Sequence, residues 1–347
     1  MARADLRQLG EFGLIQRLIR HGPGLAPGHA VLVGPGDDAA VIAIGGGRAL
    51  ALTTDVLVEG VDFERRWCPP RALGAKALAV NLSDLAAIGA RPTSYLVTLG
   101  LPPDTPLKYI DQLHAGMTQQ ARRHRLTLLG GDLSASDRVF VAITTLGTVR
   151  ANRIVRRAGA RSGDVLCVTG TLGDARAGLE RLQAAGRADR GYLAGRQLEP
   201  TARVAAGLAL SETRLATAMI DLSDGLTADL VHLCAASAVG ACIDEGRLPL
   251  ARGLMQYARA AGRDPVGYAL AGGEDFELLF TVRPERVREL ERLARHLKLA
   301  LTPIGWITPR RNGLTVATIG GHTRTLPAQG YDHFRPPLAR ARSSSRH

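Results

Sequence analysis

The sequence lacks long apolar runs and has few aromatic side chains. No uninterrupted apolar stretch approaches the roughly 20 residues needed to span a bilayer. The N-terminal residues mix charges of both signs and lack the apolar core of a secretory signal. Aromatic residues make up only 4% of the 347 residues, so side chains on which single-stranded nucleic acid could stack are scarce. We therefore expect a cytoplasmic protein with neither a membrane nor a nucleic acid as its partner.

The basic charge is not concentrated in one place. The formal net charge is +12, but of the 44 basic residues only Lys76, Lys108 and Lys298 are lysine, and the arginines are spread along the chain. Residues 338–347 contain three of those arginines and no acid, which predicts a basic disordered tail. An arginine-rich nucleic-acid-binding protein stays an alternative, and steeply salt-dependent DNA or RNA binding would identify it.

Several catalytic signatures are also missing. The sequence has no GxxxxGK[ST], GxSxG or HExxH motif, which excludes a Walker-type nucleotide fold and gives no nucleophile or zinc-protease pattern. Its four cysteines form no CxxC pair, so buried reduced thiols are expected. VGPGDDAA imitates a dinucleotide fingerprint but precedes a strand-like VIAI instead of a helix. VTGTLGDARAGL is either a phosphate-binding helix N-terminus or a tight structural turn.

The order of apolar patterns predicts two α+β domains with mixed sheets. After an N-terminal helix, residues 1–150 contain expected strands at 38–44, 48–58, 94–101, 126–133 and 139–149, and expected helices at 70–89 and 107–124. Residues 151–337 contain expected strands at 164–170, 276–282, 302–308 and 314–320, and expected helices at 174–186, 201–213 and 225–238. The stretch IDLSDG should be a strand end that turns into the last of these helices.

Isolated acids recur at the ends of predicted strands or in glycine turns, among small or apolar neighbours. For one such aspartate an N-cap or turn role is the simpler explanation. Six similar settings favour oxygen-rich binding of a hard cation instead, because Mg²⁺ takes carboxylates and commonly bridges to substrate phosphates. The sequence therefore predicts a magnesium cluster that serves a phosphorylated ligand. The six acids lie in the five motifs GDD, TTD, NLSD, GGD and IDLSDG, and they are Asp38, Asp55, Asp84, Asp132, Asp221 and Asp224.

A resemblance to a known family rests on nine motifs in a fixed order. They are GPGDDAAVI, TTDVLVEGVDF, NLSDLAAIGARP, GGD, RRAGARSGD, VTGTLGDARAGL, IDLSDGL, GGEDFELLF and GYDHF, from Glu11 to about Phe334. In these motifs the chain closely resembles the thiamine-monophosphate kinase family. The general layout is shared with aminoimidazole ribonucleotide synthetase and selenophosphate synthetase, so another ATP-dependent enzyme of the synthetase type is the alternative.

The resemblance implies a fold and an activity. It implies a homodimer formed through an N-terminal metal-binding and ATP-binding domain (1–150), whose sheets make a barrel across the interface. A sandwich-like C-terminal domain (151–337) would complete the active site. The implied reaction is direct in-line transfer of the γ-phosphoryl group of ATP to thiamine monophosphate, in a magnesium-cluster site without a P-loop or a general base.

The resemblance also implies roles for individual residues. At one position the chain departs from the family, because Asp62 stands where a histidine near the substrate is common. The implied metal ligands are Asp38, Thr53, Thr54, Asp55, Asp84, Asp132, Asp221 and Asp224, the nucleotide contacts are Gly131, Asp132, Arg157 and Ser223, and the substrate contacts are Asp62, Glu274 and Tyr331.

Overall fold

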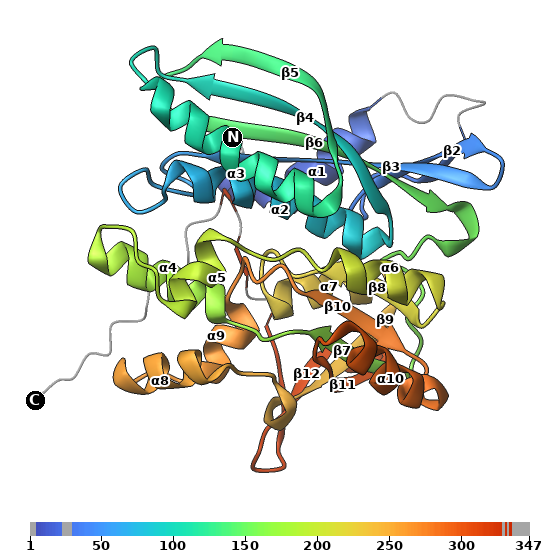
Figure 1. Ribbon diagram of the computed structural model, residues 1–347. Coiled ribbons are helices and arrows are strands. Elements are labelled where there is room, and N and C mark those ends of the chain that lie inside the picture. Colours follow the sequence, from blue (N-terminus) through green and yellow to red (C-terminus); the bar gives the residue numbers. More distant parts are fainter. Residues whose placement is uncertain (1–4, 23–29, 328–329, 332, 335–347) are drawn as a thin grey trace, which may run out of the picture.

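The computed structural model describes residues 5–22, 30–327, 330–331 and 333–334 and has two α+β domains, each with a mixed sheet (Figure 1). The predicted tail, residues 338–347, and Asp332 of the GYDHF motif lie outside the described residues. Within the described part, no helix is long and apolar enough to cross a membrane. All four cysteines are buried and unpaired, as predicted.

The first domain has a six-stranded sheet in the order β1-β2-β3-β6-β4-β5. The pair β4–β5 is parallel and the other pairs are antiparallel, so the predicted mixed sheet is confirmed. The sequence patterns missed only the short β1. The elements are α1 (Leu6–His21), β1 (Val31–Val33), β2 (Ala40–Gly45), β3 (Arg48–Val58), α2 (Pro70–Ile88), β4 (Arg91–Leu101), α3 (Leu107–His124), β5 (Thr127–Ala135) and β6 (Phe140–Arg150).

The second domain has a seven-stranded sheet in the order β13-β12-β9-β11-β7-β10-β8. Its strands are β7 (Val165–Thr169), β8 (Ala216–Asp221), β9 (Val239–Asp244), β10 (Leu278–Val282), β11 (Leu301–Pro309), β12 (Leu314–Ala317) and β13 (Thr323–Thr325). Its helices are α4 (Asp174–Ala185), α5 (Tyr192–Leu198), α6 (Val204–Glu212), α7 (Leu226–Ser237), α8 (Arg252–Ala260), α9 (Pro265–Ala271) and α10 (Val287–Leu297). Short 3₁₀ turns are η1 (Ala151–Arg153), η2 (Glu245–Arg247), η3 (Pro284–Arg286) and η4 (Arg310–Asn312).

Both faces of the second sheet are covered. Along β10, Leu278 and Phe280 pack into one apolar cluster, whereas Leu279 packs into another on the opposite face. This alternation follows from the two-residue period of a strand. At β10 the sheet is thus buried on both faces, whereas the edge strand β13 is exposed. The barrel across a dimer interface and the domain boundary near residue 150 remain predictions.

Helix α2 joins the two domains and carries two residues of the site described below. It starts at Pro70 and ends at Ile88, and the next residue, Gly89, has a left-handed φ of 74°, as expected for a helix stop. Its small residues permit close contacts, since a Cβ on Gly74 would lie 2.0 Å from the Leu113 carbonyl oxygen of α3. On the other side, a Cβ on Gly207 of α6 would lie 2.1 Å from the Ala86 carbonyl oxygen. A helix buried on nearly all sides is therefore fixed between the first sheet and the second domain.

Candidate functional site

Three acids from three elements meet where the domains join. Asp38 lies in the turn between β1 and β2, Asp84 in α2, and Asp221 at the end of β8. One carboxylate oxygen from each lies within 4.8 Å of the others. Asp38 is 8% exposed and Asp221 3% exposed. Two of the three acids are thus buried and Asp84 is partly buried, and such a group of like charges is unfavourable without a cation to compensate them.

The electrostatics of Asp84 and Asp221 show this lack of compensation. Burial, followed by the charge of Asp38, raises the pKa of Asp221 to about 8. Burial and the charges of Asp55 and Asp221 raise the pKa of Asp84 well above its usual value. Arg157 supplies partial compensation, because its Nη2 donates to Asp38 Oδ1 at 2.8 Å. The raised pKa values indicate that the cluster attracts either protons or a metal cation.

The residues fit a hard cation. Asp38 Oδ2 is buried and has no hydrogen-bond partner within the described residues. An unsatisfied buried acceptor of this kind calls for an unseen ligand, and oxygen-only donors suit Mg²⁺. The cluster is therefore a candidate magnesium site.

Strand β3 adds two of the predicted ligands to this cluster but not a third. Thr53 Oγ1 donates to Asp84 Oδ2 at 2.6 Å. Burial raises the pKa of the neighbouring Asp55, and a hydrogen bond with Asp84 opposes that rise. Thr54 alternates to the other face of the strand, where its Oγ1 donates to the Ile143 carbonyl oxygen at 3.2 Å. Within one chain, Thr54 is therefore turned away from the acids.

Gly131 and Asp132 lie apart from the three acids in one chain. They belong to the edge strand β5, where Gly131 is in register with Val97, Val97 with Ile143, and Ile143 with Asp55. Three strand spacings, roughly 14 Å, therefore separate Gly131 from Asp55. Packing also explains why residue 131 is a glycine, since a Cβ there would lie 1.8 Å from the Val97 carbonyl oxygen. The metal and nucleotide roles of these two residues remain predictions.

The IDLSDG stretch forms the expected turn from strand to helix. Strand β8 ends at Asp221 and α7 begins at Leu226, with Gly225 as the N-cap residue at a φ of 119°. The sequence did not point to Asp229, whose Oδ2 accepts hydrogen bonds from the amides of Asp224 and Gly225 at 3.2 and 3.1 Å. The only feature of the sequence that could have indicated Asp229 is the presence of an acid in the first turn of a largely apolar helix. Because Gly225 is the N-cap residue of α7, the N-cap explanation for Asp224 is wrong.

The other acids do not all lie at strand ends or in glycine turns, as the sequence patterns suggested. Asp55 lies within β3 and Asp132 within β5, both inside long strands. Asp84 lies within helix α2. The pattern identified buried or partly buried acids at Asp38, Asp84 and Asp221, but Asp132 lies in a strand that is exposed along its whole length in one chain. The pattern also did not distinguish a strand end from the interior of an element.

The predicted substrate contacts lie near one another. Lys76 Nζ of α2 contacts Glu274 Oε1 at 2.5 Å. Burial raises the pKa of Asp62, the charge of Glu274 raises it further, and Lys76 and His333 oppose this rise. The pKa of Tyr331 is raised by burial and then by the charges of Asp62 and Glu274. Asp62 also has a structural contact, because its Oδ2 accepts a hydrogen bond from the Val58 amide at 2.8 Å.

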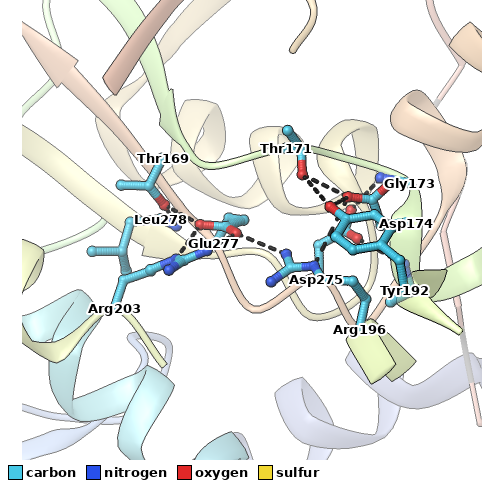
Figure 2. Close-up of polar contacts among 11 residues, drawn as sticks. Thr169, Thr171, Gly173, Asp174, Tyr192, Arg196, Arg203, Asp275, Glu277 and Leu278 are labelled. Atoms are coloured by element: carbon cyan, nitrogen blue, oxygen red, sulfur yellow. Dashed lines mark hydrogen bonds and ion pairs between the residues drawn. The ribbon is translucent and has the colours of Figure 1, made fainter. Parts of the chain in front are cut away.

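The N-terminus of α4 is not free to bind a phosphate. The amides of Gly173 and Ala175 donate to the two oxygens of Asp275, at 2.6 and 3.3 Å. Figure 2 shows Asp275 against this turn. A carboxylate from the GGEDFELLF motif thus occupies the place of an anion. Of the two explanations for VTGTLGDARAGL, the tight structural turn is correct.

Comparison with known proteins gives consistent matches over most of the chain. The sequence matches the AIR synthase related protein family, with its N-terminal domain at residues 36–149 and its C-terminal domain at residues 161–317. The thiamine-monophosphate kinases of Aquifex aeolicus (strain VF5) and Escherichia coli (strain K12) are each 39% identical to it. The alignment with the first covers 81% of this chain and 88% of the relative, and the alignment with the second covers 88% and 93%.

A solved structure is also similar over nearly the whole length. The structure of AaThiL complexed with AMPPCP and TMP has a TM-score of 0.82 and 35% sequence identity, and the match covers 96% of this chain and 100% of that chain. Escherichia coli HypE, a hydrogenase maturation protein, is 24% identical with a TM-score of 0.68, a likeness that concerns the fold alone.

Proposed function

The chain belongs to the thiamine-monophosphate kinase family, and from that premise we propose that it transfers the γ-phosphoryl group of ATP directly to thiamine monophosphate, giving thiamine diphosphate. Support comes from a relative whose structure contains AMPPCP, an ATP analogue, together with TMP. The observation that carries the proposal is the cluster of Asp38, Asp84 and Asp221, whose carboxylates lie within 4.8 Å of one another.

The chemistry of the reaction suits this cluster. A phosphate monoester with a second pKa near 6 is already largely ionised at neutral pH, so the acceptor oxygen needs no general base. The obstacle is repulsion between two polyanions, and phosphoryl transfer depends mainly on placement and electrostatic stabilisation. Bound Mg²⁺ would supply that stabilisation. We propose that Asp38, Asp84 and Asp221 hold the cation, with Thr53 and Asp55 next to them.

The remaining roles divide between the two reactants. Arg157, which contacts Asp38 at 2.8 Å, and Ser223, in the turn after β8, are proposed to bind the nucleotide. Asp62, Glu274 and Tyr331 are proposed to bind the acceptor. The further proposed ligands are Thr54 and Asp224 for the metal, Gly131 for the nucleotide and Asp132 for both.

The decisive experiment is an ADP-release assay on the purified chain with direct identification of the product. We expect ADP and thiamine diphosphate in equal amounts, with Mg²⁺ required and free thiamine inactive as acceptor. Equal turnover of thiamine would contradict the choice of acceptor. ATP consumption without thiamine diphosphate, stimulated by an amide or formamide substrate, would favour a synthetase of the same superfamily.

A further inference from the structure

The proposed acceptor contacts are attached to the same turn that carries Asp221. The Glu274 amide donates to the Ser223 carbonyl oxygen at 2.7 Å, and the Tyr331 amide donates to that of Asp224 at 3.3 Å. The Phe276 amide donates to the Leu222 carbonyl oxygen at 2.9 Å. The backbone of one short turn therefore sets the positions of two segments that are distant in sequence.

This turn leaves no room for side chains at the contact points. A Cβ on Gly273 would lie 2.7 Å from the Ser223 carbonyl oxygen, and a Cβ on Gly330 would lie 2.3 Å from the Ala228 Cβ. Glu274 has a φ of 66°, in the left-handed region that non-glycine residues rarely adopt. Such backbone strain persists only where the surroundings enforce it, and it is common at functional sites.

The Glu274 carboxylate is held at both oxygens by side chains from different elements. Lys76 Nζ contacts Oε1 at 2.5 Å, and Gln197 Nε2 of α5 donates to Oε2. Lys76 and Gln197 are each 1% exposed, whereas the Glu274 side chain is 28% exposed. The two holding groups are thus buried, whereas the side chain that they hold is partly exposed.

Helix α5 is fixed in turn by the same motif that contains Glu274. Glu277 is fully buried, and it binds Arg196 at 2.8 Å and Arg203 at 2.5 Å. Thr169 Oγ1 donates to Glu277 Oε2 at 2.6 Å. Figure 2 shows the two arginines reaching Glu277. Because Arg196 and Arg203 lie on either side of Gln197 in the sequence, their contacts with Glu277 fix the position from which Gln197 contacts Glu274.

We propose that Lys76 and Gln197 are positioning residues for the acceptor, which act by orienting the Glu274 carboxylate toward the bound thiamine phosphate. This inference rests on the proposed function. Two donors on separate oxygens fix both the direction and the rotation of a carboxylate, so its remaining lone pairs point in one direction. Lys76 also balances the charge of Glu274, so that Glu274 serves the acceptor as a directed hydrogen-bond acceptor.

The test compares Lys76→Met, Gln197→Leu and Glu274→Gln, singly and as the two double variants that contain Glu274→Gln. We expect each single variant to raise the Kd for thiamine monophosphate, measured by calorimetry without nucleotide, and its KM by about tenfold or more. The KM for ATP should stay within about twofold of the wild-type value. In the Glu274→Gln background, Lys76→Met and Gln197→Leu should add little, because residues that act through one group are not additive.

Controls separate positioning from a purely structural role. Lys108→Met removes an exposed lysine of α3 and should leave both KM values unchanged. If Lys76→Met does not fold, Gln197→Leu, which is similar in size, still gives the answer. The inference would be overturned if a folded Gln197→Leu variant kept the wild-type affinity for thiamine monophosphate. It would also be overturned if the effects of Gln197→Leu and Glu274→Gln on that affinity were fully additive. A wild-type chain that does not phosphorylate thiamine monophosphate would instead overturn the proposed function.

Discussion

Asp224 lies between two buried acids without being the cap of helix α7. The N-cap residue is Gly225, and Asp229 accepts the amide hydrogen bonds of Asp224 and Gly225. Asn at position 224 keeps the size of the side chain and removes one negative charge. We therefore expect Asp224→Asn to lower kcat by at least about 10², the scale of losing one preorganised electrostatic element, while the melting temperature without metal changes little.

The check is to measure kcat and melting temperature on the same preparation. Asp229→Ala is the matched control, because it removes an acceptor from two backbone amides and should lower the melting temperature. An Asp224→Asn variant with full activity would remove Asp224 from the metal site.

Asp62 offers a second test at the residue scale. Its Oδ2 accepts a hydrogen bond from the Val58 amide at 2.8 Å, and an imidazole nitrogen at this position can also accept. We expect Asp62→His to fold and to keep the KM for thiamine monophosphate within about tenfold, roughly 1.4 kcal/mol. Steady-state kinetics with varied thiamine monophosphate decide the question. Complete loss of activity would mean that the site depends on the carboxylate.

The sequence predicted the acids of the site better than their partners. Asp38, Asp84 and Asp221 are recognisable because a carboxylate among small and apolar neighbours needs compensation. Lys76 had the same kind of signal, a single lysine in the apolar run ALGAKALAV, but nothing nearby in sequence indicates Glu274 as its partner. Gln197 carried no signal. Contacts between residues that are distant in sequence are fixed by tertiary packing, which local patterns do not encode.

At the scale of elements, the N-terminus of α4 depends on Asp275. This carboxylate accepts hydrogen bonds from the amides of Gly173 and Ala175, a role normally filled by an N-cap side chain. We expect Asp275→Ala to lower the free energy of unfolding by about 1–2 kcal/mol, as for the loss of a strong cap. Urea denaturation measures this. As a control, Asp264→Ala removes a cap from the shorter helix α9, and a smaller loss is expected there. An Asp275→Ala variant as stable as the wild type would contradict the assignment.

The length of an element explains only part of which elements the sequence located, because α8 and α10, with 9 and 11 residues, were missed as well. The sequence located the end of α2 through Gly89 with Pro92 just beyond it, which together favour a helix stop. It missed α5, whose seven residues are too short to show a helical period. That helix is held by contacts of Arg196 with Glu277, which is 81 residues away in sequence. A short helix of this kind is specified by its tertiary partners.

At the scale of the whole molecule, the buried acids should make stability depend on pH and Mg²⁺. Burial raises the pKa of Asp221 from 3.8 to about 8, so the folded state binds this proton more tightly than the unfolded state does. Between these values the metal-free protein therefore loses stability as pH rises. Magnesium binds the ionised carboxylates and should offset this loss. We expect Mg²⁺ to raise the melting temperature more at pH 8 than at pH 5.

Thermal unfolding with EDTA or with excess Mg²⁺ tests this dependence. Asp221→Asn isolates the contribution of the cluster, because it should reduce both the pH slope and the response to Mg²⁺. Equal shifts by Mg²⁺ at the two pH values would contradict the idea that the same carboxylates bind the protons and the metal.

The first sheet has an apolar face opposite α2, which bears on the predicted homodimer. Ile42, Ile44, Val56 and Leu96 alternate toward that face and are 36%, 50%, 50% and 39% exposed. An apolar patch of this kind on a folded chain commonly marks an interface. A second copy of the chain is the occupant that the family resemblance implies. We expect a dimer in sedimentation velocity, and a monomer for the double variant Ile42→Asp/Leu96→Asp, because burying two unpaired carboxylates disfavours association.

Leu107→Asp, at an 82% exposed leucine of α3, is the matched control and should remain dimeric. A wild-type chain that sediments as a monomer at micromolar concentration, or a double variant that remains dimeric, would show that this face is not the interface.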